Sequence, residues 1–166
     1  MTNTYTPIAS VTLSSASATV DFTSIPQTFR DLILIVDGKA ATAQTFFRMR
    51  VNSDSGNNYN VVNMMGASNG SNSYSSSNQN GFDLDFFVST ITTDNNFFQI
   101  QFLDYSQTNK HKTMLLRSKT YRDTELATNS IAGRWASTSA ITSMSIFLNA
   151  GNLASGSTFS LYGIAG

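Results

Sequence analysis

The sequence predicts an all-β protein: an antiparallel β-sandwich of about nine to eleven strands, with the jelly roll as the expected winding. Apolar residues alternate with polar ones at a period of two from Val11 to Leu161, as in strands that bury one face. Clusters of Asn, Gly, Asp and Ser separate these runs. The 166 residues suit a single domain spanning 1–166, and this many antiparallel strands need two packed sheets to bury their apolar faces.

The first expected elements are alternating segments at 11–13 and 20–22, which form a hairpin or two adjacent strands. Pro26 ends this pattern because proline cannot donate a hydrogen bond to a strand ladder. Residues 31–37, DLILIVD, are apolar on both faces, as expected of a strand covered on both sides or buried in an interface. Residues 47–51, FRMRV, predict a strand with one wet face.

Later strands are expected at 82–86, 98–102, 144–148 and 159–164, while the segments at 114–116 and 131–135 alternate less clearly. The one helix considered, over residues 121–131, has weak support. The strands are expected to supply the side chains of the core, which include Phe47, Met49, Phe98, Ile100, Phe102, Met144, Ile146 and Leu148.

Residues 66–81, GASNGSNSYSSSNQNG, interrupt the strand pattern. They contain no charge, no proline and none of Val, Ile, Leu, Phe or Met. Because such short polar side chains release little hydrophobic free energy on burial, the stretch predicts a long exposed loop within the domain. Tyr74 offers the loop's one large apolar surface, and we expect it to anchor the loop on a partner.

The charge balance argues against several classes of protein. Ten Lys and Arg balance ten Asp and Glu, and only 12 % of residues are charged, while Ser, Thr and Asn number 24, 20 and 16. No basic cluster is present, so no nucleic-acid partner is expected, and the run KHK at 110–112 is interpreted as an exposed turn. The absence of cysteine excludes disulfides and thiolate metal sites. No basic leader or long apolar run occurs, so we expect synthesis in the cytosol and no membrane insertion.

Residues 52–58, NSDSGNN, place oxygen-bearing side chains at alternate positions around a glycine. A calcium loop needs several hard oxygens around a sharp turn. This segment has one carboxylate, Asp54, and lacks a bidentate Glu, so we favour a turn in which Asp and Asn bond their own backbone. We therefore expect no metal or cofactor, with calcium at 52–58 as the open alternative.

Asp83 and Asp85 lie two residues apart on one expected strand and share a face, as a glycosidase pair could. Strand residues in this relation are more often simply solvated, and the other acidic partners, Asp104 and Asp123, are distant in sequence. His111 is the sole histidine, and no phosphate-binding glycine loop occurs. We therefore expect no catalytic residues and a protein that is not an enzyme.

Three aromatic residues, Tyr59, Tyr74 and Trp135, are the candidate contacts with a partner protein or a glycan. They lie among Asn, Ser and Gln, and aromatic faces with polar neighbours suit both kinds of recognition. For Trp135, a place in the core is the favoured alternative.

Three segments carry a resemblance to a known group of proteins: YTPIASVTLSSASATVDFTSIPQTFRDLILIVDG at 5–38, FRMRVNSDSGNNYN at 47–60 and GSTFSLYGIAG at 156–166. Together they resemble small virion proteins of tailed phages, often cyanophages and other aquatic phages. Looser matches are SNQNGF, IQFLDYSQTNKHKTML and AGRWASTSAITSMSIFLNAG, so the resemblance covers nearly the whole chain. It implies a β-sandwich virion component, either a capsid decoration (cement) protein or part of a tail fibre.

The expected function is capsid decoration. On this interpretation the protein is a homotrimer that binds the outside of the major capsid shell and clamps its subunits against internal DNA pressure. A net charge of zero allows packing against neighbours with little desolvation of charge. We expect no heptad stalk or N-terminal adaptor, one of which a fibre tip normally needs. The alternative is a receptor-binding tail-fibre or baseplate domain that recognises host-surface glycans.

Overall fold

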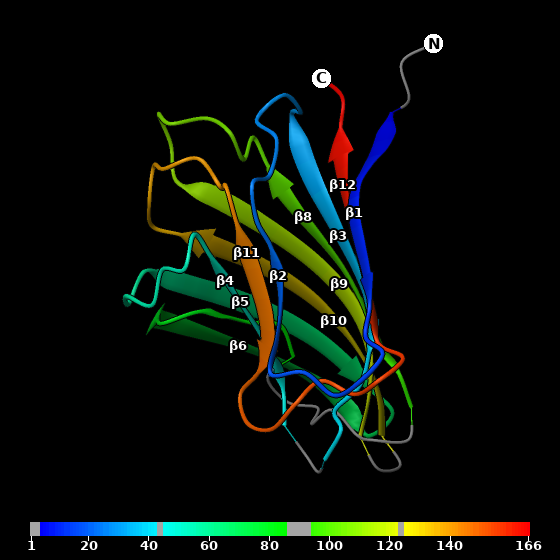
Figure 1. Ribbon diagram of the computed structural model, residues 1–166. Helices are drawn as coiled ribbons and strands as arrows, with labels where there is room; N and C mark the ends of the chain where they lie inside the picture. Colours follow the sequence, from blue (N-terminus) through cyan, green and yellow to red (C-terminus); the bar gives the residue numbers. More distant parts are fainter. Residues whose placement is uncertain (1–3, 43–44, 86–93, 123–124) are drawn as a thin grey trace.

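The computed structural model describes residues 4–42, 45–85, 94–122 and 125–166, and all regular structure in these ranges is β-strand (Figure 1). None of it is a helix long and apolar enough to cross a membrane. The strands are β1 (Tyr5–Thr12), β2 (Thr19–Phe22), β3 (Asp31–Gly38), β4 (Phe47–Val51), β5 (Tyr59–Ala67), β6 (Gly70–Gln79), β7 (Phe82–Asp83), β8 (Asn96–Leu103), β9 (Lys112–Arg122), β10 (Glu125–Trp135), β11 (Met144–Leu148) and β12 (Thr158–Ile164).

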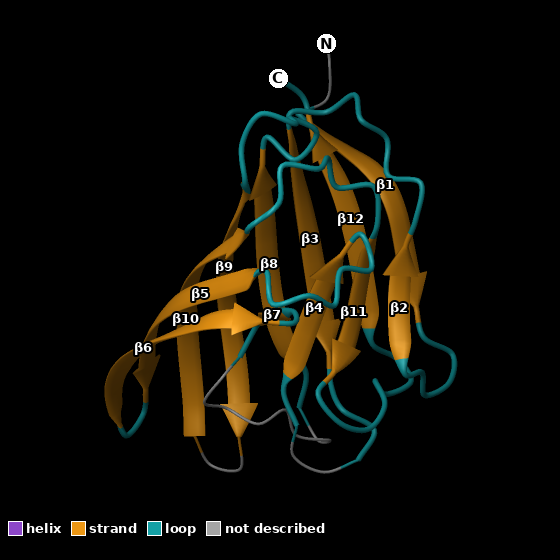
Figure 2. Cartoon of the chain, turned by 90° about the vertical axis from the view of Figure 1, so that its left-hand side faces the viewer, coloured by secondary structure: helices purple, strands orange, loops and turns teal. Residues whose placement is uncertain are grey.

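These strands form two antiparallel sheets. The large sheet has eight strands in the order β1-β12-β3-β8-β9-β10-β5-β6, and the small sheet has four in the order β2-β11-β4-β7. In Figure 2 the small sheet lies in front of the β1, β12 and β3 region, while the β5–β6 end of the large sheet extends to the side. The predicted antiparallel β-sandwich is confirmed, with twelve strands in the described residues where about nine to eleven were expected.

The strand order contains a simpler unit. Without the hairpins β5–β6 and β9–β10, the large sheet reads β1-β12-β3-β8, opposite β2-β11-β4-β7. Each step along the chain between these eight strands changes sheet, except the step from β4 to β7, which are neighbours in the small sheet. This alternation agrees with the expected jelly roll, which stays a prediction, and the two hairpins extend the large sheet beyond β8.

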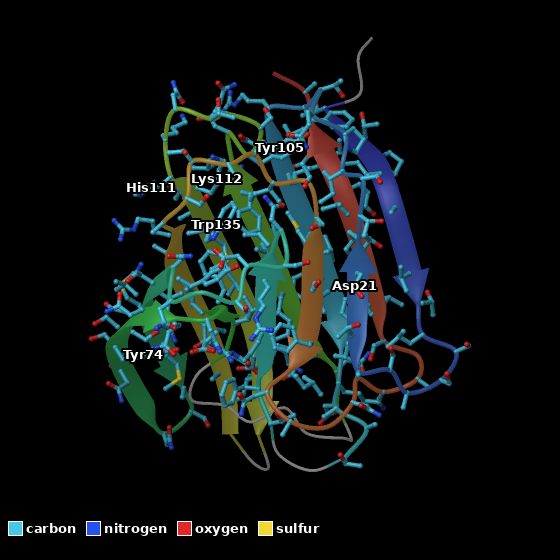
Figure 3. All side chains as sticks on the ribbon, turned by 60° about the vertical axis from the view of Figure 1, so that its left-hand side comes forward. Asp21, Tyr74, Tyr105, His111, Lys112 and Trp135 are labelled. Carbon is cyan, nitrogen blue, oxygen red and sulfur yellow. The ribbon has the colours of Figure 1, made fainter. Side chains whose placement is uncertain are left out.

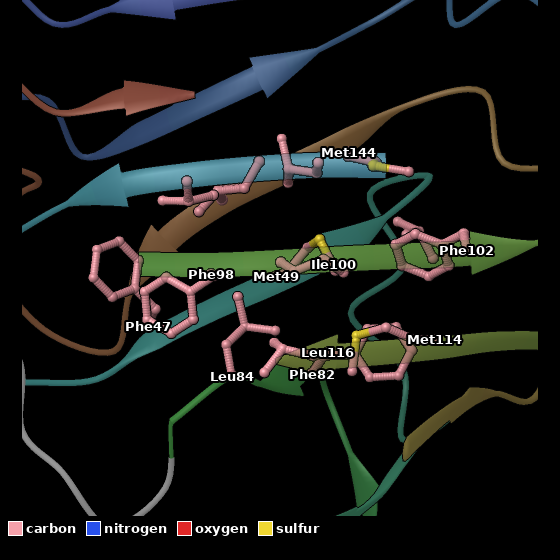
Figure 4. Packing of buried hydrophobic residues seen from close by; sticks show 14 of the residues in the cluster. Phe47, Met49, Phe82, Leu84, Phe98, Ile100, Phe102, Met114, Leu116 and Met144 are labelled. Carbon is pink, nitrogen blue, oxygen red and sulfur yellow. The ribbon is translucent and has the colours of Figure 1, made fainter. Parts of the chain in front are cut away.

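The core lies between the two sheets and confirms the predicted face assignments. The eight residues expected there, from Phe47 to Leu148, are all at most 5 % exposed. The rings of Phe47 and Phe98 lie 4.8 Å apart between centroids, at one end of the part of the cluster drawn in Figure 4. Gly133 on β10 admits Phe82 so closely that an added Cβ would lie 2.8 Å from the Phe82 ring.

The predicted loop at 66–81 is wrong. Residues 66 and 67 end β5, and residues 70–79 form β6, which pairs with β5 from Ala67↔Gly70 to Tyr59↔Gln79. Sequence reasoning failed because β6 is held by main-chain pairing at the end of the sheet, which needs no apolar side chains. Only residues 68 and 69 form the turn.

The weak helix at 121–131 is also wrong, because β9 and β10 pair there in register from Lys112↔Trp135 to Arg122↔Glu125. The inner face of this hairpin carries a buried network of amides and hydroxyls. Asn63 Nδ2 donates to Asn129 Oδ1 at 3.0 Å, and Asn129 Nδ2 donates to the hydroxyls of Ser118 and Thr120 at 3.1 and 3.3 Å. Because polar residues fill inward positions here, the alternation of apolar residues that would reveal the strands is weak.

Candidate functional site

The turn at 51–59 forms as a hydrogen-bonded structure around Asp54. Its carboxylate accepts from Trp135 Nε1 at 2.6 Å, Asn58 Nδ2 at 2.9 Å and the Gly56 amide at 2.8 Å. The side chain expected to be the sole carboxylate of a calcium loop therefore binds protein donors, as the favoured turn interpretation requires. The described residues contain no group of three or more His, Asp or Glu side chains that could hold a metal ion.

Tyr59 and Trp135 are not surface contacts, which corrects the prediction for both. They are 0 and 2 % exposed, because β5 and β10 pair them directly on the inner face of the large sheet. Burial, the largest influence, raises the pKa of the Tyr59 phenol to about 12. The alternative of a core position for Trp135 is confirmed.

Tyr74 lies apart from these two residues, on β6 and opposite Asn63 (Figure 3). Its side chain is half-buried on the inner face of the large sheet, and it belongs to β6 and not to the exposed loop that the sequence predicted. The three aromatic candidates therefore do not converge on one binding surface.

Asp83 and Asp85 are buried structural residues, not solvated ones, which corrects the expected alternative to a glycosidase pair. Asp83 is 3 % exposed and accepts from Arg48 Nε at 2.7 Å, and Asp85 is 1 % exposed and accepts from the Phe47 amide at 2.7 Å. Burial, the largest influence, raises the pKa of Asp83, although the charge of Arg48 opposes it. Asp104 pairs with Lys110, and Asp123 lies outside the described residues.

The run at 110–112 is an exposed turn only in part. Lys110 and His111 are exposed, whereas Lys112 begins β9 and is 0 % exposed. The Lys112 ammonium donates to the carbonyls of Lys110 and Thr138 at 2.9 and 3.1 Å. Burial, followed by the nearby charge of Lys110, lowers the pKa of Lys112.

The feature with the properties of a binding surface is the outer face of the large sheet, where β5, β8 and β9 present four exposed apolar side chains. Val62, Met64, Phe97 and Leu115 are 56, 65, 42 and 43 % exposed. Contiguous exposed apolar residues mark interaction surfaces more often than isolated ones do.

The pairing register aligns the outward side chains in rows across the strands. The first, the apolar row, is Tyr162, Ile33, Gln101, Leu115, Ala132 and Val62. The second, the Arg117 row, is Ile35, Gln99, Arg117, Ser130 and Met64. The expectation that residues 32–36 are apolar on both faces is explained here, since Leu32, Leu34 and Val36 face the small sheet and Ile33 and Ile35 join these rows.

Two adjoining hollows lie in this face, and Met64, Arg117 and Ser130 line both. One, of about 400 Å³, lies over the apolar row and includes Gln99, Gln101 and Leu115. The other, of about 590 Å³, lies where β8 begins and β9 ends and includes Phe97, Lys119 and Thr128.

The charge of these hollows is positive. Arg117 and Lys119 point outward from β9, and Arg117 lines both hollows while Lys119 lines the larger one. Lys119 Nζ donates to the Asn95 carbonyl at 3.3 Å. Exposed apolar side chains beside guanidinium and amide groups can bind a partner by burial and hydrogen bonding.

Sequence reasoning missed this surface, although the sequence contains a signal for it. Apolar doublets occur at Val61-Val62, Met64-Met65, Phe97-Phe98 and Leu115-Leu116. Because successive residues of a strand point to opposite faces, each doublet forces one apolar side chain outward. Only the run at 31–37 was interpreted in this way.

Comparison with known proteins adds little to this geometry. No protein-family model and no curated protein matches the chain. Among solved structures, a protein of unknown function from Shewanella oneidensis MR-1 aligns over 99 % of this chain and 77 % of its own length, at 10 % identity and a TM-score of 0.22.

Proposed function

We propose that the protein is a structural component of a tailed-phage virion, a decoration protein that attaches to the outside of the capsid shell through the outer face of its large sheet. Two observations support the proposal. The resemblance of residues 5–38, 47–60 and 156–166 supplies the class of protein. The exposed side chains of Val62, Met64, Phe97 and Leu115 are the observation that carries the mode of attachment.

The physical argument for attachment is the cost of leaving this face in water. Full burial of an apolar side chain contributes about 1.5–3 kcal/mol, and because these four are about half exposed, each can contribute about half of that to a partner that covers it. The face also holds few charges, which limits the desolvation penalty on association. Arg117 and Lys119 add orientation, because they favour a partner surface that offers carboxylates.

The test is binding of the purified protein to capsids that lack it. The double variant Val62→Ser, Met64→Ser removes two apolar contacts and should weaken binding about tenfold or more. Tyr5→Ser is the matched control, since Tyr5 is 55 % exposed on β1, outside both hollows. Occupancy is measured by cryo-EM of the particles and by co-sedimentation.

The outcomes separate clearly. The proposal is supported if the wild type and the Tyr5 variant both bind the capsids and raise their heat resistance. The double variant should then show neither effect. A wild-type protein that occupies only tail structures in the virion, or that leaves capsids unbound at every concentration, contradicts it.

A second function, recognition of host-surface glycans, is favoured by Phe97. This ring is 42 % exposed in the larger hollow, beside Lys119 in register and near the hydroxyl of Thr128. A sugar ring can stack on an aromatic face while polar neighbours bind its hydroxyls. On this alternative the protein is a tail-fibre or baseplate domain, and Phe97 takes the stacking role expected of Tyr74 or Trp135.

Titration with polysaccharide extracted from the host envelope, followed by NMR of the backbone amides, tests the alternative. Binding should shift amides of β8 and β9 and be lost in Phe97→Ala. Leu126→Ala is the control, because Leu126 is 46 % exposed but lines neither hollow. An unchanged spectrum at saturating polysaccharide, or equal loss in both variants, contradicts glycan recognition.

A further inference from the structure

The edges of the two sheets are protected unequally. An edge strand presents main-chain donors and acceptors to any chain that can pair with them, and most proteins blunt such edges with short strands, charges, prolines or bulges. In the small sheet, β2 spans four residues and includes Asp21, and β7 spans two. In the large sheet, β1 carries Pro7 and a register irregularity between Pro7 and Ala9.

The other edge of the large sheet, β6, lacks these devices along most of its length. Its ten residues, GSNSYSSSNQ, include no charge and no proline. It pairs with β5 without interruption from Gly70 to Ser76, and the one irregularity lies beyond Ser76, where Asn78 has a φ of 57°. In the described residues, no strand lies on the outer side of β6.

We infer that β6 is a self-association edge, along which a second copy of this chain adds its own β6 as an antiparallel strand. A two-fold axis normal to the sheet relates the copies, and it joins two eight-stranded sheets into one continuous sheet. Full overlap of the regular stretch 70–76 places Ser73 opposite its counterpart in the second copy. The outer faces with their hollows then lie on the same side of the assembly.

A second copy is the partner proposed for this edge because the edge carries no charge. An antiparallel two-fold contact places each residue opposite the same stretch of the partner, so any charge near its centre meets a like charge. Residues 70–76 carry none, and Ser71, Ser73 and Ser75 are short, exposed side chains that allow close approach of the two strands. A partner selected by charge would instead require a charged edge.

This arrangement differs from the homotrimer expected from the sequence, and it does not depend on capsid attachment. A two-fold contact through β6 gives a dimer of twice the 18.0 kDa chain mass, whereas a trimer gives three times that mass. The mass of the assembly in solution therefore distinguishes the dimer from the trimer.

The experiment is light scattering and sedimentation of the free protein over a wide concentration range, with Ser73→Lys and Ser73→Glu variants. The wild type should reach twice 18.0 kDa, each variant alone should remain at 18.0 kDa at the same concentrations, and an equimolar mixture of the two variants should regain the doubled mass. The mixture restores pairing because unlike charges then lie opposite each other. Hydrogen exchange should show that main-chain amides within 70–76 slow as the wild type associates.

Thr12→Lys on β1 is the matched control, since Thr12 is exposed on the opposite edge of the same sheet and its lysine should leave the doubled mass intact. Thermal unfolding of each variant shows whether the monomer is still folded. Wild-type protein that stays at 18.0 kDa, a trimer, or a dimer that survives Ser73→Lys overturns the inference. A dimer lost equally in Thr12→Lys overturns it as well.

Discussion

At the scale of single residues, Asp54 shows how a side chain suited to a metal can be used entirely for structure. Its carboxylate accepts three hydrogen bonds within the protein, one of them from the single tryptophan. Burial is the largest influence on its pKa and raises it, but the donors Trp135, Asn58 and Gly56 and the charge of Arg50 together outweigh burial and lower the pKa. The folded state therefore favours the ionised form.

We predict that Asp54→Asn destabilises the fold by about 1–3 kcal/mol at neutral pH, because the buried indole donor loses its charged acceptor. Since the folded pKa lies below 3.8, this contribution is fully present above pH 3.8 and is lost as the pH falls through the folded pKa. Urea unfolding followed by Trp135 fluorescence measures the difference at each pH. A difference between wild type and variant that persists unchanged well below the folded pKa would contradict this assignment.

Gly133 is a residue whose lack of a side chain is needed for packing. We predict that Gly133→Ala destabilises the protein by about 1–3 kcal/mol, because its Cβ would lie 2.8 Å from the Phe82 ring and 2.9 Å from Met114 Cε. Gly66→Ala is the control, since its Cβ would meet Thr128 Oγ1 at an ordinary 3.7 Å. Chemical denaturation should separate the two variants, and equal stabilities would refute the packing argument.

At the scale of elements, the accuracy of the sequence predictions follows the polarity of the interior. Strands β3, β4, β8, β11 and β12 were found because their inward residues are apolar and their period of two is clear. The β9–β10 hairpin was partly mistaken for a helix, since Ser118, Thr120 and Asn129 replace apolar residues on its inner face. The edge strand β6 was mistaken for a loop because it carries almost no apolar side chains and is held by main-chain pairing with β5.

The binding surface was less predictable than the core. A period of two assigns one face of each strand to the core and the other to solvent. The outward side chains of Val62 and Met64 are therefore recognised only if pairs of adjacent apolar residues are counted. The rows on the outer face also depend on the register between strands distant in sequence, such as β10 with β5. A single sequence contains no direct information on that register, because it arises from the packing of the whole sheet.

The Arg48–Asp83 pair joins β4 to the two-residue strand β7, and a double-variant cycle tests what it contributes. We predict that Arg48→Met costs about 3–5 kcal/mol, because it leaves the Asp83 carboxylate buried without its cation. The double variant Arg48→Met, Asp83→Leu should regain most of this loss. Because burial already raises the pKa of Asp83 above 3.8, the single variant should gain stability as the pH falls through the folded pKa. Equal losses in both variants would contradict the prediction.

At the scale of the whole molecule, the large sheet has two halves with different interiors. The strands β1, β12, β3 and β8 belong to the unit that pairs with the small sheet, and their inward residues, such as Leu34, Ile100 and Phe159, are apolar. The added hairpins also bury apolar residues such as Val61, Ile131 and Trp135, but they place the amides of Asn63 and Asn129 inward beside them. The net free energy of unfolding is only a few kcal/mol, which is small beside the free energy gained by burying either half of the interior. The half that buries less apolar surface should therefore open first.

We predict that native-state hydrogen exchange divides the large sheet at β8. Amides of β3 and β12 should exchange only by global unfolding, whereas those of β5 and β6 should exchange through a smaller opening of the added hairpins with a lower denaturant dependence. Asn63→Leu with Asn129→Leu tests the cause, because it replaces the central amide pair with apolar side chains of similar size. If the polar interior limits stability, this double variant should raise the protection of β5 toward that of β3 and leave β3 unchanged. If β5 and β3 already exchange with the same free energy in the wild type, the sandwich is a single cooperative unit, and the division into an eight-strand unit and added hairpins describes its strand order alone.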